Sequence, residues 1–482
     1  MMRSMFSAVS GLSAHQAKMD VIGNNIANVN TIGFKGGRVT FAEAFNQTLK
    51  GASAGQGGRG GTNPMQIGLG INVGAVETNH TRGAVERTEI PTDLMINKEG
   101  FFIVSDDVNY ANRHYTRAGN FSVDKFGNVL TSEGYSVLGY NIDPDTLGQE
   151  NPTFENELSG LIIPKGKPFP AKSTGKGYDT TTSSYPVLVS PDDIGVSFDG
   201  NLNAGSDIPA EYDGNAIGTP GIGGINDIIK IGNEINKIEP KTAVARDTTF
   251  TVFDELGGEH EVRVAFIKAA ANQWKVCTID KDGKISDIHP KPPATSDYLE
   301  FDSTTGKPVN GKEIDLIVKA ASGNDGDLLP NGAKSFIFRM DLSKITQHDN
   351  DSDASATSIV GYKSGSFESF DIGPDGVITV TYSNGEKSPT GRLALAKFKN
   401  PAGLVKGQGN MFDVTPNSGM PLIGKPAEAG FSDLSPGSLE MSNVDLSREF
   451  TTMITTQRGF QANSKIITTT DEMLQELVNL KR

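Results

Sequence analysis

Cysteine and long apolar segments are nearly absent from this sequence of 482 residues. Cys277 is the single cysteine, so the chain can form no internal disulfide and holds no cysteine-rich metal site. No run of about eighteen apolar residues occurs, so no segment is expected to cross a membrane. The N-terminal residues also lack the succession of charged, apolar and small residues that marks a cleaved signal peptide, so none is expected.

Aromatic residues are scarce, at 7% of the chain, and Trp274 is the only tryptophan. Glycine is abundant, with 56 residues, and the mean hydropathy is negative. These values favour β-rich modules with many turns over the dense core of a typical enzyme. A chain of 482 residues is too long for one ordinary core, so about two to four domains are expected.

The whole chain has a net charge of −14, and the negative charge is concentrated in its middle. The first 50 residues carry five basic and two acidic side chains, and residues 440–482 carry five basic and six acidic ones. The two ends are therefore nearly neutral and can pack closely. The acidic middle is expected to face solvent, and it argues against nucleic-acid binding through that part.

The C-terminal segment 439–482 is predicted to form a long helix. From Ser442 onward it has no proline and one glycine, Gly459, and Ser442 with Asp445 makes a capping-box pattern at its start. Two rows of apolar residues recur every seven positions: Met453, Phe460, Ile467 and Leu474 in one row, and Ile466, Met473 and Leu480 in the other. Such a repeat is typical of a helix that packs along another helix.

Residues 1–33 are predicted to form a second helix with the same periodicity. Its apolar face is made by Met5, Leu12, Met19, Ile22, Ile26 and Val29. Two heptad helices at opposite ends of the chain indicate that the ends pair with each other or with further copies of the chain. Packing of two ordinary amphipathic helices onto one globule explains the same pattern, and the periodicity does not decide between these interpretations.

Asparagine is concentrated near the end of the first predicted helix, at Asn24, Asn25, Asn28 and Asn30. Asparagine side chains can hydrogen-bond the backbone at a helix end, and Gly33 permits a left-handed turn. A C-terminal cap accounts for Asn30 and Gly33 but leaves the other three asparagines unexplained. We therefore expect a polar layer between packed neighbours.

The middle of the chain is predicted to consist of nested β domains, because short strand-like runs alternate with turn residues. The expected parts are an extended glycine-rich arm at 34–74 and 433–438, an inner β domain at 75–145 and 359–432, and an inserted outer β domain at 146–358 with a subdomain at 171–245. The predicted fold class is α+β and multidomain, with coiled-coil-like terminal helices around barrel-like or sandwich-like β domains.

Several segments resemble the signatures of the flagellar rod and hook protein family. They are residues 20–35 with their Thr-Ile-Gly-Phe-Lys ending, 115–121 (Tyr-Thr-Arg-Ala-Gly-Asn-Phe), 134–140, 437–446 and 457–463. Signatures occur at both ends, in the right order around a β-rich middle. The resemblance covers the whole chain except residues 146–245.

The resemblance implies a structural, non-enzymatic subunit of the flagellar hook, which polymerises into a bendable tube and transmits torque. It implies contacts with further copies and with rod, hook-cap, hook–filament junction and export proteins, in a hook at the cell exterior or on a periplasmic flagellum. A distal rod or junction protein of the same family is the first alternative, and a secreted β-domain binding protein or enzyme is the second. The residues expected at subunit contacts are Met5, Leu12, Met19, Ile22, Asn24, Asn25, Ile26, Asn28, Val29, Leu446, Met453, Phe460, Ile467, Leu474 and Leu477.

No residue pattern predicts a catalytic, cofactor or metal site. The six histidines have no ligand spacing, and the Glu-His-Glu sequence at 259–261 differs from the His-Glu-x-x-His pattern of a zinc site. The alternating aspartates at 349–353 lack the remaining positions of a calcium loop and suit a turn.

Cys277 carries a separate hypothesis that depends on the resemblance. In some hook proteins of the family a cysteine is converted to dehydroalanine and then trapped by a lysine of the next subunit, and Cys277 is a candidate for this cross-link. The alternative is a small apolar residue buried in a strand, which is a frequent environment of cysteine.

Overall fold

The computed structural model describes residues 2–52, 54–55, 60–143, 146, 152–179, 186, 188, 194–212, 215–216, 234–279, 285–287, 298–319, 328–428 and 430–480. The chain divides into two compact units: unit 1 comprises residues 1–166, 368–381 and 387–482, and unit 2 comprises 167–367 and 382–386. Terminal helices and a β-rich middle confirm the predicted fold class. None of the helices in the described residues combines the length and the apolar character that crossing a membrane requires.

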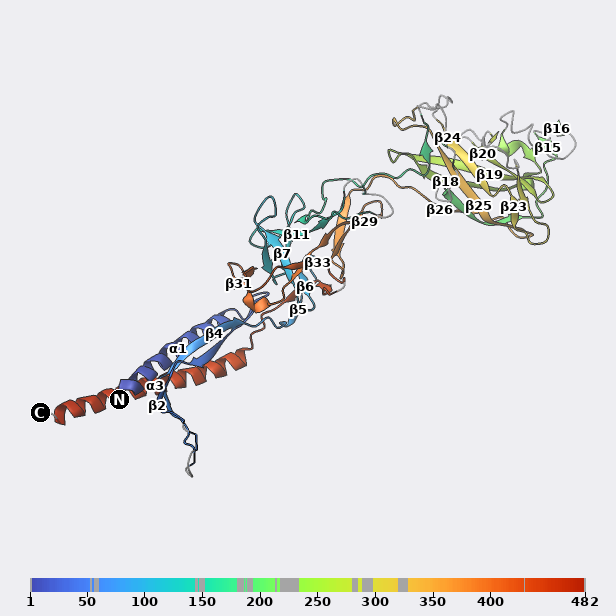
Figure 1. Ribbon diagram of the computed structural model, residues 1–482. Coiled ribbons are helices and arrows are strands. Elements are labelled where there is room, and N and C mark those ends of the chain that lie inside the picture. Colours follow the sequence, from blue (N-terminus) through green and yellow to red (C-terminus); the bar gives the residue numbers. More distant parts are fainter. Residues whose placement is uncertain are drawn as a thin grey trace. The chain divides into compact units, whose positions relative to one another are not determined.

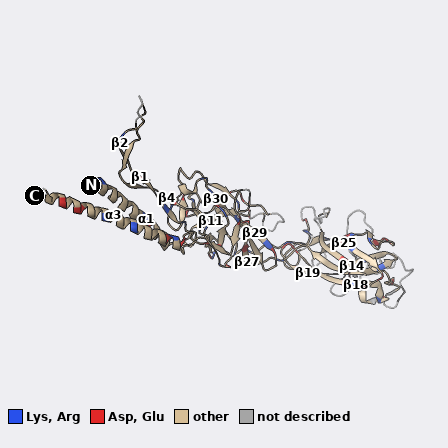
Figure 2. Ribbon diagram, turned by 90° about the horizontal axis from the view of Figure 1, so that it is seen from below, with Lys and Arg blue, Asp and Glu red and all other residues tan. Residues whose placement is uncertain are grey.

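Two helices, α1 (Met2–Ala27) and α3 (Leu446–Leu480), run side by side in unit 1 (Figure 1). They are antiparallel, because Gly11 of α1 faces Asn463 of α3 whereas the later His15 faces the earlier Gly459. Charged residues are sparse along α1 (Figure 2). The two ends of the chain therefore pair with each other, as one of the two interpretations of the heptads predicted.

The predicted end of the first helix was too late by about two turns. α1 ends at Ala27, and a turn follows in which the N–H of Thr31 donates to the carbonyl oxygen of Asn28 at 3.2 Å. Gly33 then adopts φ +69°, a left-handed conformation in which the chain leaves the helix direction. The apolar residues of 28–33 continued the helical periodicity, and this similarity caused the error.

The predicted start of the second helix was also wrong, because Asp445 and not Ser442 caps it. The Oδ1 atom of Asp445 accepts the N–H groups of Ser447 at 2.9 Å and Arg448 at 3.3 Å, so α3 begins at Leu446. Both residue types are good caps, and sequence alone does not rank two candidates three residues apart.

The segment predicted as an extended arm is a paired β ribbon. Strand β1 (Gly37–Glu43) pairs antiparallel with β4 (Ile71–Thr78), and β2 (Asn46–Lys50) pairs antiparallel with β3 (Met65–Gly68). Every residue of β2 and β3 is exposed, whereas β1 and β4 pack on α1. The usual apolar–polar alternation is weak here because so little of the ribbon is buried.

Residues 433–438, the second part of the predicted arm, are also paired. Strand β34 (Leu434–Pro436) pairs with β6 (Leu94–Ile96), and β35 (Ser438–Glu440) pairs with β5 (Val85–Arg87). The chain therefore returns to α3 through hydrogen-bonded strands.

The β body of unit 1, the name used here for its large sheet, has thirteen strands among the described residues. Its elements are β7 (Phe101–Ser105), β8 (His114–Thr116), β9 (Ser122–Val123), β10 (Val129–Leu130), β11 (Ser136–Asn141), β12 (Ser159–Gly160), β27 (Phe367–Ile372), β28 (Val377–Tyr382), β29 (Lys387–Leu393), β30 (Leu395–Lys397), β31 (Val405–Lys406), β32 (Met411–Asp413) and β33 (Leu422–Gly424), with the short helix η5 (Pro401–Gly403). β11 pairs with β29, β7 with β30 and β8 with β32, so strands from before and after the insertion form one sheet.

Among its described residues, unit 2 contains two larger sheets and a small three-stranded one. The first consists of β13 (Lys176–Gly177), β14 (Ile194–Asn203), β24 (Glu313–Val318), β25 (Phe336–His348) and β26 (Ser355–Ile359). The second consists of β18 (Val244–Phe253), β19 (Glu259–Ala270), β20 (Gln273–Ile279), β21 (Ile285–Asp287), β22 (Leu299–Phe301) and β23 (Pro308–Asn310). The small elements are β15 (Glu211–Tyr212), β16 (Asn215–Ala216), β17 (Ile238–Glu239), η3 (Ile235–Lys237) and η4 (Lys241–Ala243).

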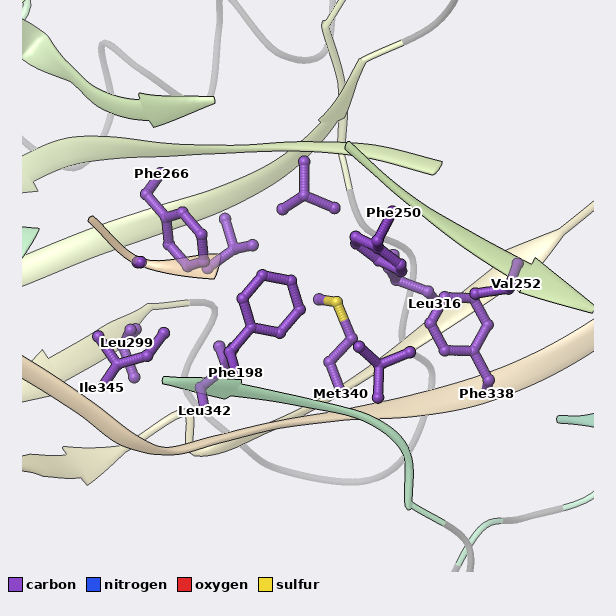
Figure 3. Packing of buried hydrophobic residues seen from close by; sticks show 14 of the residues in the cluster. Phe198, Phe250, Val252, Phe266, Leu299, Leu316, Phe338, Met340, Leu342 and Ile345 are labelled. Atoms are coloured by element: carbon purple, nitrogen blue, oxygen red, sulfur yellow. The ribbon is translucent and has the colours of Figure 1, made fainter. Parts of the chain in front are cut away.

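The core of unit 2 lies between the two larger sheets. Phe198, Phe266 and Met340 are all 0% exposed and point toward one another from different strands (Figure 3). Trp274 is also 0% exposed, and its Nε1 donates to Oε1 of Gln347 at 2.8 Å. The indole is thus buried with its one polar atom satisfied.

The border of the insertion differs from the predicted range 146–358. Residues 152–166 belong to unit 1, because β12 pairs with β11 and Ile162 forms a β-bridge with Asn128. These bridges are too short to leave a pattern in the sequence. Of the expected subdomain at 171–245, residues including 180–185 and 217–233 lie outside the described residues, while β14 and β18 belong to the two larger sheets.

Candidate assembly surface

The face of α3 that meets α1 carries the first predicted heptad row. Met453, Phe460, Ile467 and Leu474 are partly buried. Thr456 and Thr470 lie between members of this row and are each 2% exposed, so the row shares their buried face. The hydroxyls of both threonines donate to carbonyl oxygens of α3 itself at 2.7 Å. The first row is therefore largely covered inside the subunit.

Glycines allow the two helices to approach closely. A Cβ atom on Gly11 would lie 2.7 Å from Nδ2 of Asn463, and one on Gly459 would lie 2.8 Å from Nε2 of His15. Each polar side chain thus sits over a glycine of the opposite helix. Two such contacts at different heights fix the register of the pair, as polar residues do in coiled coils.

Another face of α1 is covered by the ribbon of β1 and β4. The Oγ atom of Ser10 accepts the N–H of Ile71 at 3.3 Å. The ring of Phe41 meets His15 edge-on, with ring centres 5.7 Å apart, and Nζ of Lys18 lies 5.6 Å from the same ring. Of the α1 residues predicted at subunit contacts, Ile22 is 3% exposed, and Met5, Leu12, Met19, Ile26 and Val29 are partly buried or at the helix exit.

The predicted asparagines are used mainly within the subunit. Asn25 is 3% exposed, and it donates to the carbonyl of Gly37 and accepts the N–H of Gly37, both at 2.8 Å. Asn28 donates to the carbonyl of Asn24 at 3.0 Å and accepts the hydroxyl of Thr31 at 3.0 Å. The side chain of Asn24 is exposed, and its role at a subunit contact stays a prediction.

Large apolar side chains remain exposed on both helices. On α1, Met2, Phe6 and Val9 are 58, 61 and 50% exposed and follow one face of the helix. On α3 the exposed apolar residues are Leu446, Phe450, Ile454, Ile466, Met473, Leu477, Val478 and Leu480. We call these two groups the exposed stripes. They contain the second predicted heptad row. On α3 they form two separate groups, at 446–454 and 466–480, and groups of exposed apolar side chains of this kind mark surfaces that bind a partner.

A buried ionic cluster joins three distant segments of unit 1. Lys35 follows α1, Arg117 follows β8, and Glu440 ends β35, and their side chains are 0, 4 and 1% exposed. Nζ of Lys35 lies 2.6 Å from Oε1 of Glu440, and Nη1 of Arg117 lies 3.2 Å from Oε2. Oε1 also accepts the N–H of Gly83 at 2.9 Å. Both carboxylate oxygens are therefore bonded.

The opposite charges in the ionic cluster stabilise one another's ionised forms. Burial would raise the pKa of Glu440, but the positive charges of Arg117 and Lys35, with the hydrogen bonds to the carboxylate, hold that pKa below its ordinary value. Burial lowers the pKa of Lys35, against the opposing effect of Glu440. The remaining hydrogen bonds of the two cations go to the carbonyls of Thr81 and Lys98, at 2.8 and 2.9 Å.

His80 lies near this cluster, with its ring centre 5.8 Å from that of Phe101 and 5.4 Å from that of Phe412. Burial, together with the positive charges of Lys35, Arg117 and Lys406, lowers its pKa from 6.5 to about 4. His80 is therefore neutral in the folded subunit well below neutral pH.

We expect unit 1 to lose stability as the pH falls from about 6.5 to about 4. In this window the unfolded chain protonates His80 and the folded chain does not, so the unfolded state binds more protons. We measure the urea midpoint by helical circular dichroism at about pH 7 and about pH 4.5. The decrease in this midpoint should be smaller for His80→Phe than for the unchanged chain. His348→Phe, in unit 2, serves as the control. An equal loss in the unchanged chain and His80→Phe would contradict the assignment.

Sequence reasoning did not predict the ionic cluster. Lys35 and Glu440 are 405 residues apart, and charged residues ordinarily lie on the surface. A signal was nevertheless present, since each of the segments 31–35, 115–121 and 437–443 contains one charged residue among uncharged ones.

Four family models match the chain. They are "Flagella basal body rod protein" at residues 5–35, "Flagellar hook protein FlgE/F/G D1 domain" at 95–167, "Flagellar basal body protein FlaE D2 domain" at 226–362 and "Flagellar basal body rod FlgEFG protein C-terminal" at 435–480. Lys35, Arg117 and Glu440 each lie in a matched segment, as do both terminal helices almost entirely.

Full-length relatives identify the family. The flagellar hook protein FlgE of Borreliella burgdorferi is 36% identical, and that of Treponema pallidum is 33% identical, each over 100% of both chains. The chain belongs to the flagellar hook protein family. A flagellar basal-body rod protein FlgG of Bacillus subtilis is 27% identical over 100% of both chains, so the rod alternative has weaker support than membership of the hook family.

Cys277 lies on β20 in unit 2 and is 0% exposed. It belongs to a small apolar cluster that includes Ile267, Ile279 and Tyr298. This environment suits the alternative of a buried core residue, and a cross-link would require β20 to open. The cross-link stays a prediction.

Proposed function

We propose that this chain is the structural subunit of the flagellar hook and polymerises, with further copies of itself, into a tube that bends while it transmits torque. The observation that carries the proposal is that α1 and α3 cover each other only in part, so the exposed stripes remain open on the subunit. The full-length relatives of the chain are hook proteins. The proposal includes no catalytic activity and no cofactor.

Polymerisation would cover the exposed stripes with the stripes of neighbouring copies. Fully burying one large apolar side chain contributes about 1.5–3 kcal/mol, so several together can drive association. A contact between unlike surfaces that does not close into a ring generates a helical filament. The acidic β regions suit wetter contacts, which can slide when the tube bends.

The other partners follow from the same proposal. The hook subunit would contact rod, hook-cap and hook–filament junction proteins and pass through the flagellar export apparatus. Its location would be the hook of a flagellum, at the cell exterior or in the periplasm.

The proposal is tested with the purified chain. We expect tubes in electron micrographs when the chain is concentrated in ammonium sulfate, which strengthens apolar association. Curved tubes support a hook, and straight rigid ones support the rod alternative. A chain that stays monomeric in sedimentation at every concentration, even when hook fragments are added as seeds, would contradict polymerisation.

The burial of Cys277 gives a prediction about its reactivity. We expect a maleimide to label the thiol slowly in the native chain and fast in urea, because the residue is 0% exposed. The measurement is the mass shift of the intact protein over time. Assembled tubes are then denatured and digested: a peptide joining Cys277 to a lysine of another copy would support the cross-link, and unmodified Cys277 peptides alone would exclude it.

A further inference from the structure

The ionic cluster stands where both helices join the β body. Lys35 comes eight residues after the end of α1, and Glu440 comes six residues before the start of α3. Arg117 follows β8, a strand of the β body. One carboxylate therefore connects the exit of the first helix, the entry to the second helix and the sheet.

The surrounding contacts between the helix ends and the β body are also polar. The N–H of Gly33 donates to the carbonyl of Glu440 at 2.7 Å, and Nζ of Lys406 donates to the carbonyl of Lys35 at 2.6 Å. The apolar cluster around Phe101 includes no residue of α1 or α3. Phe34 and Leu439, next to Lys35 and Glu440, are also buried, at 7 and 5% exposed. Hydrogen bonds and charges depend on angle more strongly than this apolar packing does, so we expect them to determine the direction of the helices.

Stability alone does not explain three buried charges. Removing each charge from water costs several kcal/mol, and well-packed apolar residues of similar volume are often as stable or more stable. What the charges add is geometry. Each oxygen of Glu440 has its own cation, at 2.6 and 3.2 Å, and Gly83 adds a third bond, so the carboxylate can satisfy its partners in one orientation only.

We propose that Lys35, Arg117 and Glu440 form a positioning site that fixes the direction in which the helix pair leaves the β body. The next step rests on the proposed function above. In a tube, this direction determines whether the helices and the β body of one subunit can contact neighbouring subunits at the same time. The cluster then sets the helical twist and rise with which subunits add.

The test compares a charge-free cluster with the native one. The triple variant Lys35→Met, Arg117→Met and Glu440→Leu keeps the volume and removes the directional bonds. Spin labels at the exposed positions Thr451→Cys on α3 and Ser122→Cys on β9 report the distance between helix and β body in the monomer. Cys277 is buried and is not expected to take a label.

We expect the labelled triple variant to have a urea midpoint close to that of the labelled chain with the native cluster. Its label-to-label distance distribution should be at least about twice as wide. The control is Arg38→Gln with Glu77→Gln, which removes an exposed ion pair of unit 1 whose side chains are 70 and 47% exposed, and it should keep the narrow distribution. A narrow distribution in a folded triple variant would overturn the proposal.

Two further measurements keep the result decisive. Should the triple variant fail to fold, Glu440→Gln, which has the same shape, is measured at a urea concentration below its midpoint, and a narrow distribution there also overturns the proposal. In tubes, cryo-electron microscopy of the triple variant should show changed twist or rise. The distances are measured on monomers, so absence of tubes from the unchanged chain would count against the proposed function and leave the positioning site standing.

Discussion

Aspartate in place of both Ile466 and Met473 is expected to abolish polymerisation while the subunit stays folded. The two side chains are 42 and 50% exposed and belong to the exposed stripe of α3, so the monomer loses little when they change. In a polymer each would be buried against a neighbour, which contributes about 1.5–3 kcal/mol, and a buried carboxylate adds a further penalty. The critical concentration should therefore rise by roughly 100-fold or more.

The measurement is sedimentation of polymers over a concentration series, with the urea midpoint of the monomer recorded alongside. The matched control places the same two charges on the same helix at exposed polar positions, Ser464→Asp and Gln475→Asp. The control is expected to polymerise near the concentration of the unchanged chain. Equal polymerisation of the stripe variant and the control would show that α3 does not use this stripe.

The substitution Glu440→Leu is expected to lower the free energy of unfolding of unit 1 by about 3–5 kcal/mol, because it leaves two buried cations without their carboxylate. Lys35 and Arg117 are 0 and 4% exposed and cannot turn toward water without moving the segments that carry them. Urea unfolding followed by helical circular dichroism reports this loss, because both long helices belong to unit 1.

The matched control for that substitution is Glu77→Leu. Glu77 pairs with Arg38 at 2.6 Å, but the side chains are 47 and 70% exposed, and exposed pairs contribute about 0–1 kcal/mol. A loss for Glu440→Leu no larger than that of the control would mean that water reaches the cluster in solution.

The sequence predicted the helices and their heptads, and the structure explains where that prediction stopped. Two apolar rows on α3 have the same seven-residue period, yet one row meets α1 and the other stays exposed. Periodicity shows that a face is apolar and does not show which partner covers it. The contacts of Gly11 with Asn463 and Gly459 with His15 decide this, and they depend on atoms from both ends of the chain.

The nested order of β segments was predicted from the return of a similar composition after residue 359, but the predicted range of the insertion, 146–358, differs from the observed borders of unit 2. β11 pairs with β29 across the whole insertion, and such pairing leaves no local pattern. Likewise, the glycine-rich ribbon was interpreted as an arm because its strands bury little. The ionic cluster was not predicted, because its members are brought together only by the complete fold of unit 1.

The separation of 405 residues between Lys35 and Glu440 has a consequence for incomplete chains. A chain cut short before Glu440 retains two cations that have no carboxylate to meet, and it also lacks α3, the partner that α1 packs against. Such a fragment cannot form the helix pair of unit 1, so under the proposed function we expect that it does not add to a polymer. Under that proposal, the pairing of the two chain ends would restrict polymerisation to molecules that contain both helices.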